Sequence, residues 1–401
     1  MGEPHPFFQY TSEIVSWRLG RTETVRTASP PEPARVAAQV ERVLRHLAGR
    51  RGVALVGLGA GRLAAALAEA LPEEVALTVL DADPEAVRRL LAAGELAWLQ
   101  AEGSRQLLVD TSAMALFCLV AGAGISPATT LVTVTPEVGG SDEHRELAQW
   151  RRLFLGSRPA PGPASETALP RPTLAVLARP DEPDLPGFFA AAAGLADRAV
   201  VLWDAGEVPA AAREAEALGV PVTHLARRLA DDFAAQRNAL LAACAGPWIL
   251  SLDPDERPGP GFGPALRRLM AMPGVGGAFF PRLTLYPDAG RAKVGYGLWP
   301  DVQLRLFRTT AAGPRYVRPV HERLEGLAGR AALALDAPLH HYNRLLADRA
   351  AVLAKLAGFD AAAGRPTHRL NLDYPSLPLE FFAPPAGLPP EGRVLLLPPM
   401  W

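Results

Sequence analysis

The sequence predicts an α/β protein made of two domains. Apolar runs of strand length alternate with stretches of helical periodicity along most of the 401 residues, which is typical of βαβ units. A chain of this length favours two domains over one. Residues 157–171 are rich in Pro, Gly, Ala and Ser, which is the composition of a linker. We therefore expect residues 34–156 and 172–360 to fold as separate α/β domains.

Composition limits the classes of function. Hydrophobic residues at 49% and charged residues at 21% are typical of globular proteins that bury sizeable cores. The formal net charge of -1 gives no basis for a nucleic-acid surface, so no nucleic-acid partner is expected. Cys118 and Cys244 show neither metal-ligand spacing nor a disulfide framework.

The chain shows no pattern of a secreted or membrane-spanning protein. Its first residues lack the basic start and apolar core of a signal peptide. The most apolar internal run, residues 113–125, is too short to cross a bilayer. We expect a cytoplasmic location, either free or peripheral on the inner face of the cytoplasmic membrane.

The first domain is expected to begin after an irregular segment, residues 1–33, which ends in a Pro-rich run. Residues 34–47 have helical periodicity, and an apolar strand begins at Val53. A helix reaching Leu71 and a second strand, residues 75–80, complete a βαβ unit.

A glycine-rich turn follows the first strand of this unit. Gly57, Gly59 and Gly61 allow close backbone approach to a ligand, and Asp81 ends the second strand, where a ribose-binding carboxylate would stand. The segment resembles the first half of an S-adenosylmethionine-dependent methyltransferase, or more broadly a Rossmann-like nucleotide fold. The acidic residue that this family carries before the first glycine is replaced by Val56. A degenerate scaffold or partner-docking domain is therefore the alternative to a nucleotide site.

The second domain opens with alternating strands and helices. Strands are predicted over 173–178, 199–203 and 220–224, and helices over 188–195 and 210–218. Later residues predict strands at 277–280 and 283–286 interrupted by Pro281, strands at 303–308 and 334–340, and a helix at 344–359. Residues 361–401 form a Pro-rich tail that is expected to be irregular.

An acidic stretch follows the central strand of this domain. Residues 233–244 have helical periodicity, and residues 248–252 form an apolar run of strand length. Asp253, Asp255 and Glu256 therefore emerge together at the carboxyl end of a buried strand, where open α/β sheets bind ligands. Three carboxylates repel one another unless a cation neutralises them, and such oxygens suit Mg²⁺ or Mn²⁺ together with a substrate phosphate.

Four blocks of this domain resemble family 2 glycosyltransferases, most closely the bacterial branch that acts on lipopolysaccharide cores and other surface glycans. They are Gln236-Arg237-Asn238, the run from Trp248 to Arg257 with its Asp-x-Asp motif, residues 303–308 and residues 320–324. The resemblance covers about residues 172–359. It implies a GT-A type fold, a divalent metal ion and a nucleoside diphosphate sugar as the donor.

The resemblance implies a role for each matching residue. The metal ligands implied are Asp255, Asp253 and His321, with a buried structural histidine as the alternative for His321. The donor-binding residues implied are Asp204, Arg237, Asn238 and Asp253. The candidates for the catalytic base are Glu322 and Glu256, with Glu322 preferred because Glu256 adjoins the metal.

Three further residues are candidates for the acceptor side. Gln303 and Arg305 share one face of a predicted strand, with simple strand solvation as the alternative. Trp299 lies in a Gly-rich loop, where it either stacks on a sugar or fills a hydrophobic gap.

These features predict an inverting, metal-dependent hexosyltransferase whose acceptor is a cell-envelope saccharide or a lipid-linked glycan. The family carries a second Asp shortly after the residue that matches Asp204, but here Ala205 and Gly206 follow. This departure leaves open an inactive pseudo-glycosyltransferase that binds glycan or scaffolds a partner. A methyltransferase that uses the N-terminal domain is the third hypothesis.

Overall fold

The computed structural model describes every residue of the chain except 1–2, 18–30, 138–141, 163–170, 231, 311–312, 320–321, 347–349, 351–372, 384–392 and 400–401. The chain forms two compact units. The first comprises Met1–Gly156, Gly290–Pro300 and Leu356–Leu388, and the second comprises Ser157–Ala289, Asp301–Lys355 and Pro389–Trp401. Each unit is discontinuous in sequence, which differs from the continuous domains that linker composition predicts.

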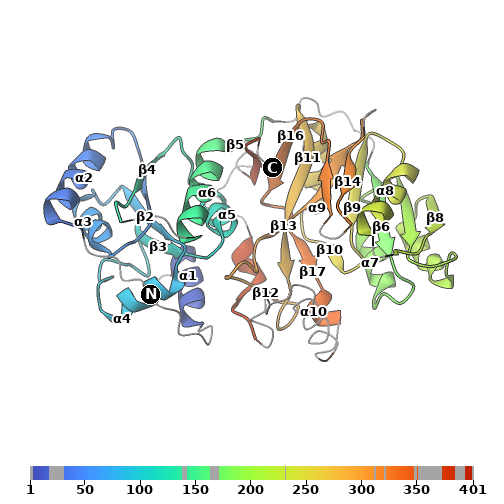
Figure 1. Ribbon diagram of the computed structural model, residues 1–401, viewed down its shortest axis with the longest axis horizontal. Helices are drawn as coiled ribbons and strands as arrows, with labels where there is room; N and C mark the ends of the chain where they lie inside the picture. The colour runs from blue at the N-terminus through green and yellow to red at the C-terminus, as the bar shows by residue number, and fades with distance from the viewer. Residues whose placement is uncertain are drawn as a thin grey trace. The chain divides into compact units, whose positions relative to one another are not determined.

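The first unit is built on a parallel sheet in the order β3-β2-β1-β4. Helices α2 and α3 lie on one side of this sheet, and α5 and α6 lie on the other (Figure 1). The elements of this unit are α1 (Pro6–Ser16), α2 (Pro33–Arg45), β1 (Gly52–Val56), α3 (Arg62–Ala70), β2 (Ala76–Asp81), α4 (Pro84–Ala92), β3 (Arg105–Val109), α5 (Ala113–Gly122), β4 (Thr130–Val134), α6 (Asp142–Gly156), β12 (Arg291–Lys293), β18 (Ser376–Pro378) and η2 (Leu379–Phe382). The expected Rossmann-like arrangement of strands is therefore present.

The N-terminal residues contain a helix rather than being irregular throughout. Phe7, Tyr10 and Ile14 recur at helical spacing and are fully buried in α1. Pro6 does not break this helix, because the first turn needs no backbone N–H from it. The hydroxyl of Thr11 donates to the Leu107 carbonyl at 2.7 Å, so α1 packs on β3.

Two distant segments complete the first unit. β12 pairs with β18 in antiparallel register, so the C-terminal tail is partly ordered into a strand instead of being irregular. Trp299 is only 6% exposed, and its ring lies 6.1 Å from Tyr10 and 5.2 Å from Phe382, centroid to centroid. Trp299 thus fills a hydrophobic gap in this unit.

The second unit is built on one large mixed sheet in the order β5-β19-β16-β11-β13-β9-β6-β7-β8, with β17 joining β10 to β11. Its parallel part, β8-β7-β6-β9, repeats the strand order of the first unit. The elements of this unit are β5 (Arg158–Pro159), β6 (Thr173–Ala178), α7 (Leu185–Ala192), β7 (Arg198–Trp203), η1 (Ala210–Leu218), β8 (Val222–Ala226), α8 (Phe233–Ala243), β9 (Trp248–Leu252), β10 (Glu256–Pro258), α9 (Phe262–Ala271), β11 (Val275–Thr284), β13 (Asp301–Arg308), β14 (Arg315–Val317), β15 (Arg323–Glu325), β16 (Arg330–Ala334), β17 (Leu339–His341), α10 (Asn343–Leu346) and β19 (Val394–Leu396). The mixed α/β class predicted from the sequence is confirmed.

Two strand predictions in this unit are wrong. β11 runs continuously through Pro281, because β13 pairs with it on one side from Gly277 to Arg282, whereas on the other side β16 pairs only as far as Phe279 and β17 only from Arg282 onward. Neither β16 nor β17 needs the missing N–H of Pro281. Residues 334–340 hold the end of β16 and the start of β17 rather than a single strand.

Chain segments expected to be a linker and a tail also contribute to this sheet. Within the predicted linker, Arg158 and Pro159 pair with Leu396 and Leu395 of the tail, and β19 pairs in turn with β16. Local composition cannot indicate a pairing between segments so distant in sequence. Most of the predicted helix 344–359 lies outside the described residues.

The two faces of the second sheet bury different cores. On β13, Leu306 packs in the core with Phe188 and Phe262, whereas Phe307 packs with Leu240 of α8. The alternation of side chains along a strand explains this division. Among the described residues, no helix combines the length and the apolar character needed to cross a membrane.

Candidate functional site

The carboxyl ends of β6, β7 and β9 meet at one edge of the second sheet. β6 lies between β7 and β9 in the sheet, so the strand order reverses there. Such a reversal leaves a crevice beyond the strand ends, which is where open α/β sheets bind ligands. Asp253 follows β9 directly, and Asp204 follows β7.

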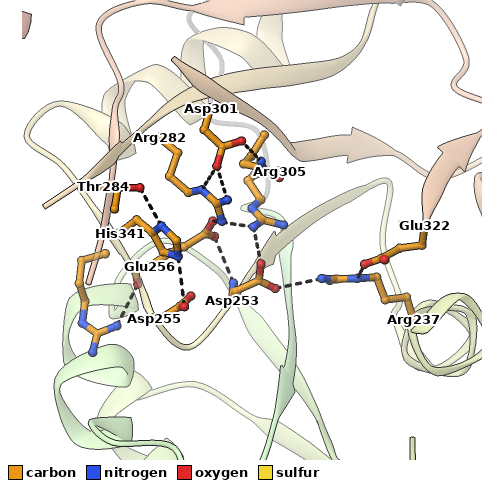
Figure 2. Close-up of polar contacts among 12 residues, drawn as sticks. Arg237, Asp253, Asp255, Glu256, Arg282, Thr284, Asp301, Arg305, Glu322 and His341 are labelled. Atoms are coloured by element: carbon orange, nitrogen blue, oxygen red, sulfur yellow. Dashed lines mark hydrogen bonds and ion pairs between the residues drawn. The ribbon is translucent and has the colours of Figure 1, made fainter. Parts of the chain in front are cut away.

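Asp253 is held by two arginines (Figure 2). Its Oδ1 accepts from Arg237 Nη2 at 3.1 Å, and its Oδ2 accepts from Arg305. Burial opposes ionisation of Asp253, but the guanidinium groups of Arg305 and Arg237 outweigh it and hold its pKa well below the ordinary value. Asp253 is therefore a fixed, ionised carboxylate.

A β-bulge places Arg305 at the centre of this site. The register between β11 and β13 steps from Ala278–Leu306 to Phe279–Leu304, which leaves Arg305 without a partner residue. Arg305 is only 5% exposed, and its Nη2 also donates to Glu256 Oε1 at 2.5 Å. One guanidinium group thus bridges the two carboxylates.

Glu256 is completely buried. Its Oε1 also accepts from Arg282 Nη1 at 3.1 Å, and its Oε2 accepts from the backbone N–H of Asp253 at 3.2 Å. Both oxygens are engaged by the protein, so the geometry does not present Glu256 to a substrate hydroxyl. For Asp253 and Glu256 the neutralising charge comes from guanidinium groups, rather than from the metal ion that the sequence predicts.

Asp255 differs from its neighbours, because its partner is a histidine. His341 Nε2 lies 3.2 Å from Asp255 Oδ2, and His341 Nδ1 lies 3.0 Å from the hydroxyl of Thr284. Burial opposes ionisation of Asp255, but the hydrogen bond from His341 lowers its pKa. Its side chain is 33% exposed, so it can reach a ligand.

The Asp255–His341 pair has the chemistry of a cation site. In one tautomer His341 Nε2 donates directly to Asp255 and Nδ1 accepts from the Thr284 hydroxyl; in the other, Nδ1 donates to Thr284 and Nε2 offers its lone pair to a cation held beside the carboxylate. A carboxylate and an imidazole suit Mn²⁺, and Mg²⁺ or Mn²⁺ would complete its shell with water and phosphate oxygens. The described residues contain no group of three or more potential ligands. His321, the third expected ligand, lies outside the described residues.

Glu322 is joined to this site through Arg237. Arg237 Nε donates to Glu322 Oε1 at 2.8 Å, while the same guanidinium group holds Asp253. Burial and the nearby Arg305 oppose the charge on Arg237, but Asp253, Tyr316 and Glu322 outweigh them and raise its pKa. The Glu322 side chain is 19% exposed, so it keeps access to solvent that Glu256 lacks.

The cluster retains an excess of negative charge. Among its described members, five carboxylates face three guanidinium groups, an excess of two carboxylates over guanidinium groups. The carboxylates are Asp253, Asp255, Glu256, Asp301 and Glu322, and the cations are Arg237, Arg282 and Arg305. An excess of this size matches the charge of one divalent cation.

The remaining expected residues have other partners. Asp204 Oδ1 accepts from the backbone N–H of Leu229 at 2.8 Å, and Gln303 donates to Asp301 at 2.6 Å. Asn238 bonds to the backbone of Tyr316. Trp299, expected on the acceptor side, belongs to the first unit.

In the first unit, the glycine-rich turn follows β1 as expected. Gly57, Gly59 and Gly61 have φ angles of +87°, +57° and +81°, which favour glycine. Asp81 accepts from the N–H of Leu58 at 2.7 Å, and burial raises its pKa to about 6. Asp81 therefore stabilises the turn by a hydrogen bond. Only 7% of its surface is exposed, which leaves little of it accessible to a ribose hydroxyl.

Glu137, which follows β4, contacts the same turn. Its carboxylate accepts from the N–H of Ala60, and a Cβ placed on Gly59 would lie 2.4 Å from Glu137 Oε2. Burial raises the pKa of Glu137. The protein's own carboxylate thus occupies the position where this turn would bind an anionic ligand.

Several site residues were not predicted. His341, Thr284, Arg282 and Asp301 all join the cluster. A charged residue inside the apolar run of β11 was the available signal for Arg282, because such a residue needs a buried counter-ion. His340 and His341 are adjacent on one strand, so side-chain alternation predicts that at most one of them points inward but does not say which.

Comparisons with known proteins give limited information. No family model matches the chain, and no curated protein matches it. Among solved structures, the crystal structure of S. aureus TarS, residues 1–349, is similar with 11% identity and a TM-score of 0.25. The alignment covers 34% of this chain and 47% of the other. TarS is a glycosyltransferase, but similarity at this level carries no argument about function.

Proposed function

We propose that the protein is an inverting glycosyltransferase of the GT-A type. It would move a hexose from a nucleoside diphosphate sugar to a cell-envelope saccharide or a lipid-linked glycan. The observation that supports this best is the Asp255–His341 pair at the switch point of the sheet, with Glu322 tied to the adjoining Asp253 through Arg237. Three of the four motif blocks that resemble family 2 contribute these residues, except His341.

In this proposal Asp255 and His341 hold Mg²⁺ or Mn²⁺. When bound, the ion neutralises charge on the departing diphosphate. Asp253 is fixed by its two arginines beside this position and faces the donor. Asp204, at the end of β7, contacts the nucleoside. Glu322 removes the proton of the acceptor hydroxyl, because it is the more accessible of the two carboxylates considered for that role.

One observation favours a second candidate, a glycan-binding pseudo-glycosyltransferase. Asp253 and Glu256 are already neutralised by arginines, so their charge does not require a metal ion. Such a protein would bind a saccharide acceptor or scaffold a partner without turning over the donor.

Calorimetry and thermal shift with UDP, GDP, CDP and TDP, each with and without Mn²⁺, test the proposal. S-adenosylmethionine is added as a separate arm for the first unit. We expect one nucleoside diphosphate to bind only with Mn²⁺, and Asp255→Ala or His341→Ala to weaken that binding by about tenfold or more. Glu216→Gln, a change at an exposed carboxylate near the end of η1, is the matched control and should bind as wild type does.

Turnover then separates the two candidates. Release of sugar from the matching donor, even by slow hydrolysis, supports the transferase. Metal-dependent nucleotide binding without turnover, with saccharide binding retained, favours the pseudo-enzyme. If no nucleoside diphosphate binds with or without Mn²⁺, the proposed site is refuted.

A further inference from the structure

Three consecutive residues of α8 each hold a different segment at the edge of the second sheet. The Gln236 side chain is fully buried and donates to the Arg227 carbonyl at 2.5 Å, just after β8. Arg237 joins Asp253 to Glu322. Asn238 bonds to Tyr316 of β14. Successive helical side chains point about 100° apart, so one short motif can reach three neighbours.

The side chain of Asn238 makes two hydrogen bonds to the backbone of Tyr316. Its Nδ2 donates to the Tyr316 carbonyl at 2.9 Å, and its Oδ1 accepts from the Tyr316 N–H at 2.8 Å. β14 pairs only with β15 in the described structure, as a separate two-stranded sheet. The carboxamide therefore satisfies both backbone groups that a second strand would otherwise pair.

The β14–β15 hairpin that Asn238 binds also contains Glu322. This residue lies directly before β15, and its carboxylate is fixed by Arg237 one position before Asn238. A third contact, from the Phe233 N–H to the Pro319 carbonyl at 2.9 Å, anchors the loop between β14 and β15 at the start of α8. Docking of the hairpin on α8 thus determines where Glu322 lies relative to Asp253.

We propose that Asn238 is a positioning residue, which docks the β14–β15 hairpin so that Glu322 is presented to the acceptor. This role rests on the proposed function as far as Glu322 is the base. It differs from the donor-binding role that the family resemblance implies for Asn238, because both polar groups of the carboxamide are used by Tyr316.

Asn238→Leu removes both hydrogen bonds at nearly constant volume, and Asn238→Asp keeps the acceptor for the Tyr316 N–H. Ala242→Gln, an exposed change one turn further along α8, is the matched control. Trypsin cleavage of the hairpin after Arg315 and Arg323 reports undocking without any assay of activity. We expect cleavage there to be about tenfold faster or more in Asn238→Leu, intermediate in Asn238→Asp and unchanged in the control.

The kinetic arm uses the donor and metal identified for wild type. We expect the kcat of Asn238→Leu to fall about tenfold or more, while metal-dependent affinity for the nucleoside diphosphate stays within about twofold of wild type. If Asn238→Leu does not fold, Asn238→Asp is compared with wild type instead. A smaller increase in the cleavage rate together with a smaller fall in kcat then supports the proposal. Cleavage at the wild-type rate, or lost nucleotide affinity with an intact hairpin, overturns the proposal. If wild type turns over no donor, the transferase function fails, and faster hairpin cleavage still supports docking by Asn238.

Discussion

Replacing Arg305 by Met should destabilise the second unit strongly. Met keeps an unbranched apolar side chain like the stem of Arg but lacks the guanidinium group, so the change mainly deletes the charge that bridges Asp253 and Glu256. Breaking a buried ion pair by removing one partner typically costs about 3–5 kcal/mol, because an uncompensated charge stays buried. Here each carboxylate keeps a second arginine, Arg237 or Arg282, so we expect the lower end, about 3 kcal/mol.

This loss corresponds to about 6–12 °C in the melting temperature of the second unit, at about 2–4 °C per kcal/mol for a domain of that size. A chain with two compact units need not unfold in one step, so hydrogen exchange of the β9 and β13 amides in increasing urea is the suitable assay. It reports the free energy of unfolding of the unit that contains the cluster.

Arg308→Met is the matched control on the same strand. Arg308 is exposed, and its guanidinium group lies 4.9 Å from the ring centroid of Trp248, so its loss should cost no more than about 1 kcal/mol. Combining Arg305→Met with Glu256→Gln should cost less than the two single changes together, because one partner of the broken pair is then uncharged. A loss below about 1 kcal/mol for Arg305→Met would refute the buried-network argument.

Two further predictions concern the first unit. Burial raises the pKa of Asp110 from its ordinary 3.8 to about 7, so the stability linked to it is full below about pH 4 and is lost as the pH rises through about 7, by up to about 4 kcal/mol. Asp110→Asn should flatten this dependence in pH-resolved hydrogen exchange of β3, and stability that instead rises over this range would contradict the assignment. Trp299→Ala should cost the first unit about 3–5 kcal/mol by leaving a cavity beside Tyr10, measured by exchange of the α1 amides. Nucleotide binding should be retained in that variant. If nucleotide binding is lost instead while the α1 amides keep their protection, Trp299 contributes to the ligand site.

Features set by neighbours in sequence were predictable. The α/β class, the helix start at Asp232 and the buried strand before Asp253 follow from side-chain periodicity and capping, which act over a few residues. The acidic residues that follow that strand were predictable for the same reason. The helix α1 was not predicted, although Phe7, Tyr10 and Ile14 have helical spacing and Pro6 at the first turn is compatible with a helix.

The tertiary structure decided which side chains meet. His341 reaches Asp255 from 86 residues away, and Arg305 reaches Glu256 from 49 residues away, through a bulge that shifts the register of β13. Strand register and bulges depend on partner strands, so no local pattern reveals them. The sequence therefore determined that carboxylates gather at the end of β9. Only the folded chain determined that guanidinium groups neutralise most of them and that Asp255 faces a histidine instead.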